Sequence, residues 1–150
     1  MRRDDDRMFE VEITDVHDEV ALTELRERLI AHNIAVTGYD DGRSLSCFLR
    51  DEEGEMVAGL DGFTWGGYAK IEWLWLAEHL RGSGLGTRMV GAAEAEAAAR
   101  GCRVVRVDTH TFQAPGFYER LGYRRIGDAT DTPVGHGEIF YVKELRRQEE

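Results

Sequence analysis

A glycine-rich run between an apolar segment and an alanine-rich one constrains this chain more than any other feature. The run, Arg81-Gly-Ser-Gly-Leu-Gly-Thr87, follows the strand-like residues 71–77 and precedes a helical pattern at 87–100. A turn of this kind leaves backbone N–H groups uncovered at a helix N-terminus, a geometry that binds phosphates. Closely spaced glycines also let a ligand approach the backbone. The sequence therefore predicts a phosphate-binding loop within a strand–loop–helix unit.

Two common phosphate loops do not fit the spacing of this run. A dinucleotide fingerprint counted from Gly82 requires a third glycine at position 87, where Thr87 stands. A Walker A loop requires a lysine between Gly86 and Thr87, and none is there. What remains is the pattern Arg-Gly-x-Gly-x-Gly, and a glycine-rich turn that binds nothing is the open alternative.

The size and charge of the chain limit the number of its domains and the kinds of partner it can bind. Its 150 residues fit one domain, 1–150, in which residues 1–7 form a polar lead-in. The net charge of −10 argues against nucleic-acid binding, which needs a basic face. The same charge is compatible with a cationic substrate, or with an acidic surface that serves solubility alone.

The sequence gives no indication of a membrane or an oxidising compartment. No stretch of 18 uninterrupted apolar residues is present, and residues 1–7 lack the apolar core of a signal peptide. Cys47 and Cys102 stand in neither a metal-binding nor a CxxC spacing, so we expect small buried apolar side chains there. A cytoplasmic location follows as the expectation.

Hydrophobic periodicity predicts an α/β chain (a mixed α+β sheet) in the order β-α-β-β-β-α-β-α-β-β. Alternation indicates a strand at 9–13, and helical spacing indicates a helix up to Asn33, capped by Asp15 or Asp18. The other expected strands are 44–49, 56–63, 70–77, 103–108, 123–126 and 138–142, and the other helices are 87–100 and 116–121. We expect a mixed sheet of six to seven strands with helices on both faces, in which 70–77 is a central strand covered on both sides.

Glu72 is the exceptional residue of its strand. A carboxylate between Ile71 and Trp73 is costly to bury without a partner, and burial there would raise its pKa and make it a better base. The alternative is a structural ion pair with Lys70 or Arg88, or a place at a sheet edge. The residues alone leave both interpretations open.

Tyr118 and three histidines are further candidates for chemistry. Phe117 and Leu121, four apart on a short helix, are expected to face the core and leave Tyr118 on another face. A buried tyrosine with a structural hydrogen bond is the alternative. The histidines lie in loops or at strand ends, where a plain polar role is favoured, and none has a second ligand at metal spacing, so no metal site is predicted: His79, His110 and His136.

Two motifs in this order resemble the GNAT superfamily of acyl-CoA-dependent N-acetyltransferases. The family's phosphate-loop pattern, Arg/Gln-x-x-Gly-x-Gly/Ala, reads Arg81-Gly-Ser-Gly-Leu-Gly86 here. Its pattern Ala-x-x-Phe/Leu-Tyr-Glu-Lys/Arg-x-Gly-Phe/Tyr reads Ala114-Pro-Gly-Phe-Tyr-Glu-Arg-Leu-Gly-Tyr123. The resemblance is strong over 70–127 and rests on pattern alone over the first 60 residues.

The resemblance implies a role for each matching position. The family splays its fourth strand (here 70–77) from its fifth (103–108) at a bulge, and backbone groups of the fourth pair with pantetheine. Tyr118 would protonate the departing CoA thiolate, and Glu72 would act as the general base, directly or through water. The positions implied for acetyl-CoA are Leu74, Leu76, Ala77, Arg81, Gly82, Ser83, Gly84, Leu85, Gly86, Thr87, Thr111, Ala114 and Phe117. Thr111 replaces the family's usual Asn, and Pro115 and Gly116 are unusual in that helix.

The implied activity is transfer of an acetyl group from acetyl-CoA to a primary amine of a small molecule or peptide. Direct attack by the amine needs no enzyme nucleophile and no metal, so the lack of a Ser–His or Cys–His arrangement fits this reaction. Alternatives are a non-catalytic acyl-CoA-binding module, or a transferase of another acyl group such as succinyl. The family also makes a homodimer possible.

Overall fold

The computed structural model describes residues 9–146, which form two compact units divided after Gly38. The first unit, in its described part 9–38, contains one helix, and the second, 39–146, contains the sheet. Each unit is described by itself. The sequence-based expectation of a single domain over 1–150 stays a prediction, and its polar lead-in at 1–7 lies outside the described residues.

The helix of the first unit, α1 (Glu19–Thr37), has the start that the sequence predicts. Of the two candidate caps, Asp18 is the one used, because its Oδ1 accepts a hydrogen bond from the Ala21 N–H at 3.0 Å. Arg28 pairs with Glu24 at 2.6 Å, one turn apart. The chain leaves the helix at Gly38, whose N–H donates to the Ile34 carbonyl at 2.8 Å.

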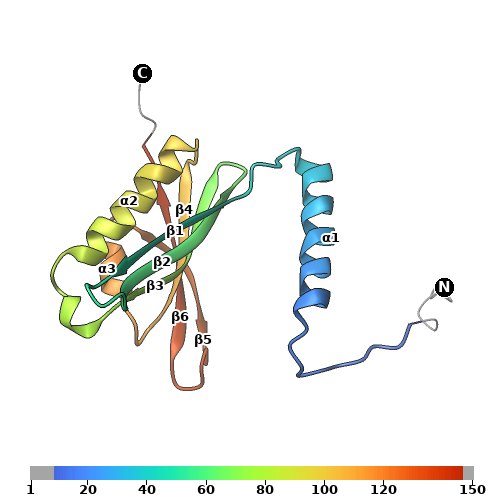
Figure 1. Cartoon of the computed structure of the whole chain (residues 1–150), viewed down its shortest axis with the longest axis horizontal. Helices are drawn as coiled ribbons and strands as arrows, with labels where there is room; N and C mark the ends of the chain where they lie inside the picture. Colours follow the sequence, from blue (N-terminus) through green and yellow to red (C-terminus); the bar gives the residue numbers. More distant parts are fainter. Residues whose placement is uncertain (1–8, 147–150) are drawn as a thin grey trace. The chain divides into compact units, whose positions relative to one another are not determined.

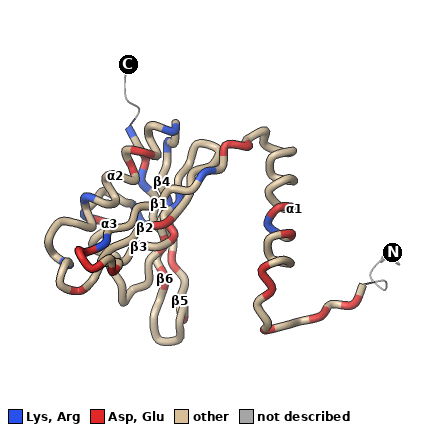
Figure 2. Tube along the Cα trace, in the orientation of Figure 1, with Lys and Arg blue, Asp and Glu red and all other residues tan. Residues whose placement is uncertain are grey.

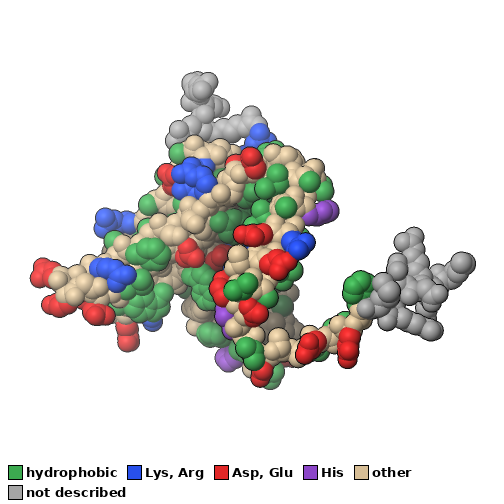
Figure 3. All heavy atoms as spheres, turned by 45° about the vertical axis from the view of Figure 1, so that its right-hand side comes forward, with side chains coloured by type: hydrophobic (Ala, Val, Ile, Leu, Met, Phe, Trp, Pro, Cys, Tyr) green, Lys and Arg blue, Asp and Glu red, His purple; other side chains and the backbone are tan. Residues whose placement is uncertain are grey.

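The strand expected at 9–13 is absent, which corrects the sequence-based order. Residues 9–15 form no regular structure and join no backbone ladder within the described chain. Alternation of apolar and charged side chains produces a strand only where a neighbouring strand supplies hydrogen-bond partners. Figure 3 shows hydrophobic side chains at the surface among charged ones. Taken by itself, this unit leaves the following apolar side chains exposed: Phe9, Val11, Ile13, Val16, Val20, Leu25, Leu29, Ile30 and Val36.

The second unit is built on a six-stranded mixed sheet in the order β1-β2-β3-β4-β6-β5 (Figure 1). Its strands are β1 (Arg43–Arg50), β2 (Met56–Trp65), β3 (Tyr68–Leu76), β4 (Val104–His110), β5 (Arg124–Thr130) and β6 (Gly137–Glu144). Only the central pair β3–β4 is parallel, and its crossover runs through α2 (Leu85–Ala99). This mixed sheet confirms the predicted fold class.

The core of this unit lies between one face of the sheet and the helices α2 and α3 (Pro115–Arg120). Small residues on α2, such as Ala93 and Ala97, let the helix pack closely on buried Leu60 and Val105 of the strands. Trp73 and Trp75 of β3 lie on the other face, which no helix of the second unit covers, so coverage of this strand on both sides stays a prediction. A helix on that second face stays a prediction, since α1 belongs to a separate unit.

A bulge and a fork distinguish β3 from its neighbours. Against β2, Gly62 pairs with Ile71 and Asp61 with Trp73, which leaves Glu72 as the extra residue. Against β4, pairing ends at Ile71 and Val107, although both strands continue. The two central strands therefore diverge at the bulge, in agreement with the splay that the family implies. We call this divergence of β3 and β4 beyond Ile71 and Val107 the fork.

Gly62 makes this bulge possible, because a Cβ at that position would lie 2.1 Å from the Lys70 carbonyl oxygen. We expect Gly62→Ala to lower the free energy of unfolding by about 1–3 kcal/mol, the usual cost of overpacking. Urea unfolding followed by circular dichroism measures this. Gly59→Ala on the same strand is the control, since its Cβ would meet the movable Phe48 ring at 3.2 Å; equal stability of the two variants would contradict the prediction.

Two bulk properties complete the description. Acidic residues occur in α1 and in the second unit alike (Figure 2), in keeping with the net charge of −10. Among residues 9–146, no helix combines the length and the apolar character needed to cross a bilayer.

Candidate active site

The glycine-rich run forms an open loop at the end of β3. A single 3-10 turn, η2 (Glu78–Leu80), follows the strand, and α2 begins at Leu85, two residues earlier than predicted. Gly82 and Gly84 adopt φ values of +75° and +82°, and a Cβ at either would meet no atom within 4 Å. The loop thus requires glycine for its backbone conformation while the space above it stays free.

The first turn of α2 presents unused donors to this space. Gly84 caps the helix without a side-chain hydrogen bond, so the first N–H groups of α2 have no capping partner among the described residues. Arg81 holds the loop against the strand by donating from Nε to the Leu76 carbonyl at 3.2 Å, and Ser83 Oγ donates to the Leu80 carbonyl at 2.5 Å. These N–H groups and the positive end of the helix dipole fit a pyrophosphate.

Backbone groups of β3 face the gap of the fork. Strand residues point their N–H and C=O groups alternately to the two sides. The Ala77 N–H donates to the Val57 carbonyl of β2 at 2.8 Å, so alternation turns the groups of Leu74 and Leu76 toward the gap. The Ala77 N–H is already used by β2 and its carbonyl accepts from the Leu80 N–H, so the contact of Ala77 with pantetheine stays a prediction that could use only the second lone pair of that carbonyl.

Glu72 lies at the bulge with an exposed side chain. The sequence predicted a buried Glu72 side chain, because neighbouring residues of a regular strand face opposite sides. At a bulge this alternation is interrupted, so Glu72 and Trp73 both lie on the exposed side of the strand. The structural ion pair considered as the alternative is absent as well, since Lys70 pairs with Asp108 at 3.4 Å and no described residue pairs with Glu72. A carboxylate without a partner therefore lies beside the fork.

Tyr118 lies on α3 and is 5% exposed. Its ring packs edge-to-face on Phe117 and Tyr123, and its hydroxyl hydrogen-bonds to none of the residues 9–146. Burial raises the pKa of Tyr118 to about 12, so the phenol stays protonated at neutral pH. The alternative interpretation gave Tyr118 a purely structural hydrogen bond. Such a bond is made by the neighbouring Tyr123 instead, whose hydroxyl donates to Glu94 at 3.0 Å.

Packing between the two motifs brings α3 to the loop. A Cβ at Gly86 would lie 3.3 Å from the Phe117 ring and 3.7 Å from Leu76 Cδ1, so the start of α2, the end of β3 and α3 converge. Gly86 thus serves close packing, unlike Gly82 and Gly84. Ala114 precedes Pro115 as the cap residue of α3.

Thr111 has a structural partner at the end of β4. Its hydroxyl accepts from the Gly137 N–H at 3.1 Å, and its own N–H donates to the Gly137 carbonyl at 2.8 Å. These two hydrogen bonds hold the β5–β6 hairpin at the end of β4. If Thr111 also contacts pantetheine, as the sequence predicts, its hydroxyl would have to bind both pantetheine and the Gly137 N–H.

Sequence reasoning did not foresee that Trp73 and Trp75 lie on the face of β3 opposite to the core residues Ile71, Leu74 and Leu76. The signal was present: apolar residues that face the core fall at Ile71, Leu74 and Leu76, and the step of three between the first two breaks the period of two. A one-residue bulge at Glu72 restores that period and places both tryptophans on the second face.

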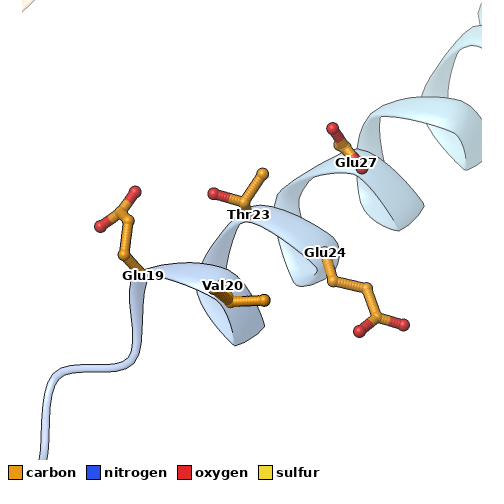
Figure 4. Close-up of a pocket in the computed structure, with 5 residues that line it drawn as sticks. All are labelled: Glu19, Val20, Thr23, Glu24 and Glu27. Atoms are coloured by element: carbon orange, nitrogen blue, oxygen red, sulfur yellow. The ribbon is translucent and has the colours of Figure 1, made fainter.

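Two other groups of residues lie apart from the loop and the fork. A hollow on the first turns of α1, lined by Glu19, Val20, Thr23, Glu24 and Glu27, is formed by one helix alone (Figure 4). It contains no residue of the loop or fork, and we assign it no function. His110 and His136 both pack on the Phe112 ring, and no cluster of metal-ligating side chains occurs within residues 9–146.

Comparison with known proteins agrees with this geometry. The acetyltransferase (GNAT) family matches residues 8–123. An acetyltransferase of Agrobacterium fabrum is 35% identical over 134 residues, covering 89% of this chain and 96% of the relative. Blasticidin-S acetyltransferase of Streptomyces morookaense is 42% identical over 95 residues, covering 63% and 70%. A crystal structure from Agrobacterium tumefaciens, assigned as an acetyltransferase, superposes with a TM-score of 0.85 at 31% identity, covering 91% and 100%.

The chain belongs to the GNAT acetyltransferase family. It is an acyl-CoA N-acyltransferase, a class that uses acetyl-CoA. The sequence-based alternative of a non-catalytic module is therefore set aside.

Proposed function

We propose that the protein transfers an acetyl group from acetyl-CoA to a primary amine of a small molecule by direct attack. The observation that carries the proposal is the fork, which has the phosphate-binding loop at its end and the unpaired Glu72 at its bulge. Blasticidin-S acetyltransferase, a relative named for a small-molecule substrate, supports a small acceptor over a peptide.

The loop, β3 and Glu72 each have a separate role in the proposed reaction. N–H groups of the loop and of the first turn of α2 bind the pyrophosphate, and N–H groups of Leu74 and Leu76 bind pantetheine and polarise the thioester carbonyl. An alkylamine has a reference pKa near ~10.4 and is mostly protonated at neutral pH, so it must lose a proton before attack. Glu72 accepts that proton, directly or through water.

Tyr118 serves the leaving group chiefly as a hydrogen-bond donor. Its pKa of about 12 exceeds the ~8.5 of a typical thiol, so complete proton transfer to the thiolate is uphill. A hydrogen bond to a charged group is worth about 1.5–3 kcal/mol. We therefore expect Tyr118→Phe to lower kcat by roughly 10- to 150-fold with acetyl-CoA affinity retained. Because its pKa is raised, Tyr118 stays protonated up to pH ~10, and the wild-type rate should not decrease below that pH through loss of the Tyr118 proton.

Tyr141→Phe is the matched control for this prediction, because the Tyr141 hydroxyl is buried without a hydrogen-bond partner among the described residues and its ring packs on Tyr118. Stopped-flow turnover and a pH profile from 6 to 10 make the comparison. Equal kcat values for Tyr118→Phe and the wild type would remove Tyr118 from the mechanism.

The assay of function mixes the protein with acetyl-CoA and a panel of primary amines that includes blasticidin S. Release of free thiol together with an amine product heavier by one acetyl group supports the proposal. Turnover with succinyl-CoA in place of acetyl-CoA would assign another acyl donor, and acetylation of peptides alone would overturn the small-molecule acceptor.

A further inference from the structure

A partly buried ionic network links α2, β6 and the chain that follows α3. Glu94 of α2 accepts hydrogen bonds from Lys143 Nζ of β6 at 2.8 and 3.1 Å, and from the Tyr123 hydroxyl at 3.0 Å. The Lys143 ammonium also lies 5.5 Å from the centroid of the Tyr123 ring. The side chains of Glu94 and Lys143 are 15% and 26% exposed, and Tyr123 is buried. All of these contacts lie within the second unit.

Tyr123 connects this network to Tyr118. The two rings pack edge-to-face with centroids 5.6 Å apart, and the Tyr123 N–H donates to the Tyr118 carbonyl at 3.1 Å. The rings of Phe117 and Tyr141 also pack against Tyr118. Of these three rings, a side-chain hydrogen bond orients that of Tyr123 alone, because Phe117 has no polar side-chain atom and the Tyr141 hydroxyl has no partner among the described residues.

The short helix α3 depends on its neighbours for a fixed position. It has six residues, and its cap residue Ala114 makes no side-chain hydrogen bond. Apolar contacts are not directional, whereas hydrogen bonds to one carboxylate define a single geometry. Replacing a buried ion pair by apolar residues is often neutral for stability, so stability alone does not require a charged Glu94. Because α2 begins at the glycine-rich loop, Glu94 joins the helix next to that loop to the ring on which Tyr118 packs.

We propose that Glu94 is a positioning residue, which together with Lys143 and Tyr123 fixes the Tyr118 hydroxyl at the leaving thiolate. This inference deepens the proposed function and rests on it, since it requires Tyr118 to serve that thiolate. The three side chains act through the Tyr118 ring and touch neither acetyl-CoA nor the acceptor. A misplacement of about 1 Å in a reacting group can cost 10²-fold in rate. The loss of rate on removing Glu94 cannot exceed the loss on removing the Tyr118 hydroxyl.

A double-mutant cycle on kcat tests this role. We expect Glu94→Gln to lower kcat by about 5- to 30-fold, with the KM for acetyl-CoA changed by less than about twofold. In a Tyr118→Phe background the same substitution should change kcat by less than about twofold, because the hydroxyl that it positions is gone. Glu96→Gln is the matched control, since it removes another ion pair of α2, that with Arg100 at 2.8 Å. Equal fold losses from Glu94→Gln in the two backgrounds would overturn the proposal.

A second variant keeps the test valid if Glu94→Gln unfolds the protein. Glu94→Gln leaves the Lys143 ammonium partly buried without its counter-ion, which costs stability. Glu94→Leu combined with Lys143→Met removes both charges and fills the space with apolar groups. This double variant should remain folded by circular dichroism and lose kcat to a similar extent. Wild-type kcat in the folded double variant would overturn the proposal.

NMR of the tyrosine rings separates failure of the network from failure of the proposed function. The chain has five tyrosines, so ¹³C-tyrosine labelling gives few ring signals, and that of Tyr118 is identified by its loss in Tyr118→Phe. Glu94→Gln should shift the Tyr118 signal, and Glu96→Gln should leave it in place. A shifted signal in an enzyme whose Tyr118→Phe variant keeps wild-type kcat would support the network and overturn the proposed role of Tyr118. An unshifted signal would overturn the network even where acetyl transfer is observed.

Discussion

Gly84→Val should weaken acetyl-CoA binding by at least about 100-fold while leaving the protein folded. Gly84 has a φ of +82°, and the space where its Cβ would point is empty. In the proposed complex that space holds the pyrophosphate, so two methyl groups would displace the phosphate from the N–H groups of α2. Isothermal titration with acetyl-CoA measures the loss, and circular dichroism checks the fold.

Gly54→Val is the matched control for backbone strain. Gly54 lies in the β1–β2 turn with a φ of +86° and likewise has no atom within 4 Å of a Cβ. Both variants carry the cost of a β-branched residue at positive φ, about 1–2 kcal/mol, but only Gly84 adjoins the proposed phosphate site. Wild-type affinity in the Gly84 variant, or an equal loss in both, would contradict the phosphate assignment.

Glu72→Gln should lower kcat by about 10²- to 10⁴-fold, the usual contribution of a general base. Gln keeps the size and the exposed position at the bulge but cannot accept the proton of the ammonium. The rate of the variant should then rise steeply with pH toward the amine's own pKa, near ~10.4, because solvent must remove the proton. Initial rates from pH 6 to 10 with saturating acetyl-CoA measure this change.

Glu53→Gln removes the same charge from the exposed β1–β2 turn and controls for electrostatic effects on an acidic protein. The mechanism predicts near wild-type turnover for it. A Glu72→Gln enzyme with an unaltered pH–rate profile would show that the amine loses its proton elsewhere, and Glu72 would then be a surface residue of the bulge.

The segments that the sequence placed well are those whose signals are local. Asp18 begins α1, and the glycine loop separates β3 from α2, because caps and positive-φ turns are decided by a few neighbouring residues. The strand expected at 9–13 failed for the opposite reason. Its alternation is local, but a strand exists only with a partner, and the described structure supplies none.

The candidate site divides in the same way. Motif spacing located the loop and Tyr118, and the fold then brought them together through the contact of Phe117 with Gly86. The surroundings of Glu72 could not be foreseen, because the bulge depends on Gly62 of another strand and on the carbonyl of Lys70. One extra residue turned Glu72 and Trp73 to the exposed face together.

By itself, then, the sequence determined the order of the elements from Arg43 onward, the place of the glycine-rich loop between β3 and α2, and the family resemblance. Only the tertiary structure decided the surroundings of the candidate side chains: Glu72 is unpaired at the bulge, and Tyr118 is buried against Phe117 and Tyr123. The physical reason is that glycine loops and caps are set by local backbone conformation. Burial, strand register and charge partners instead depend on residues that only folding brings together.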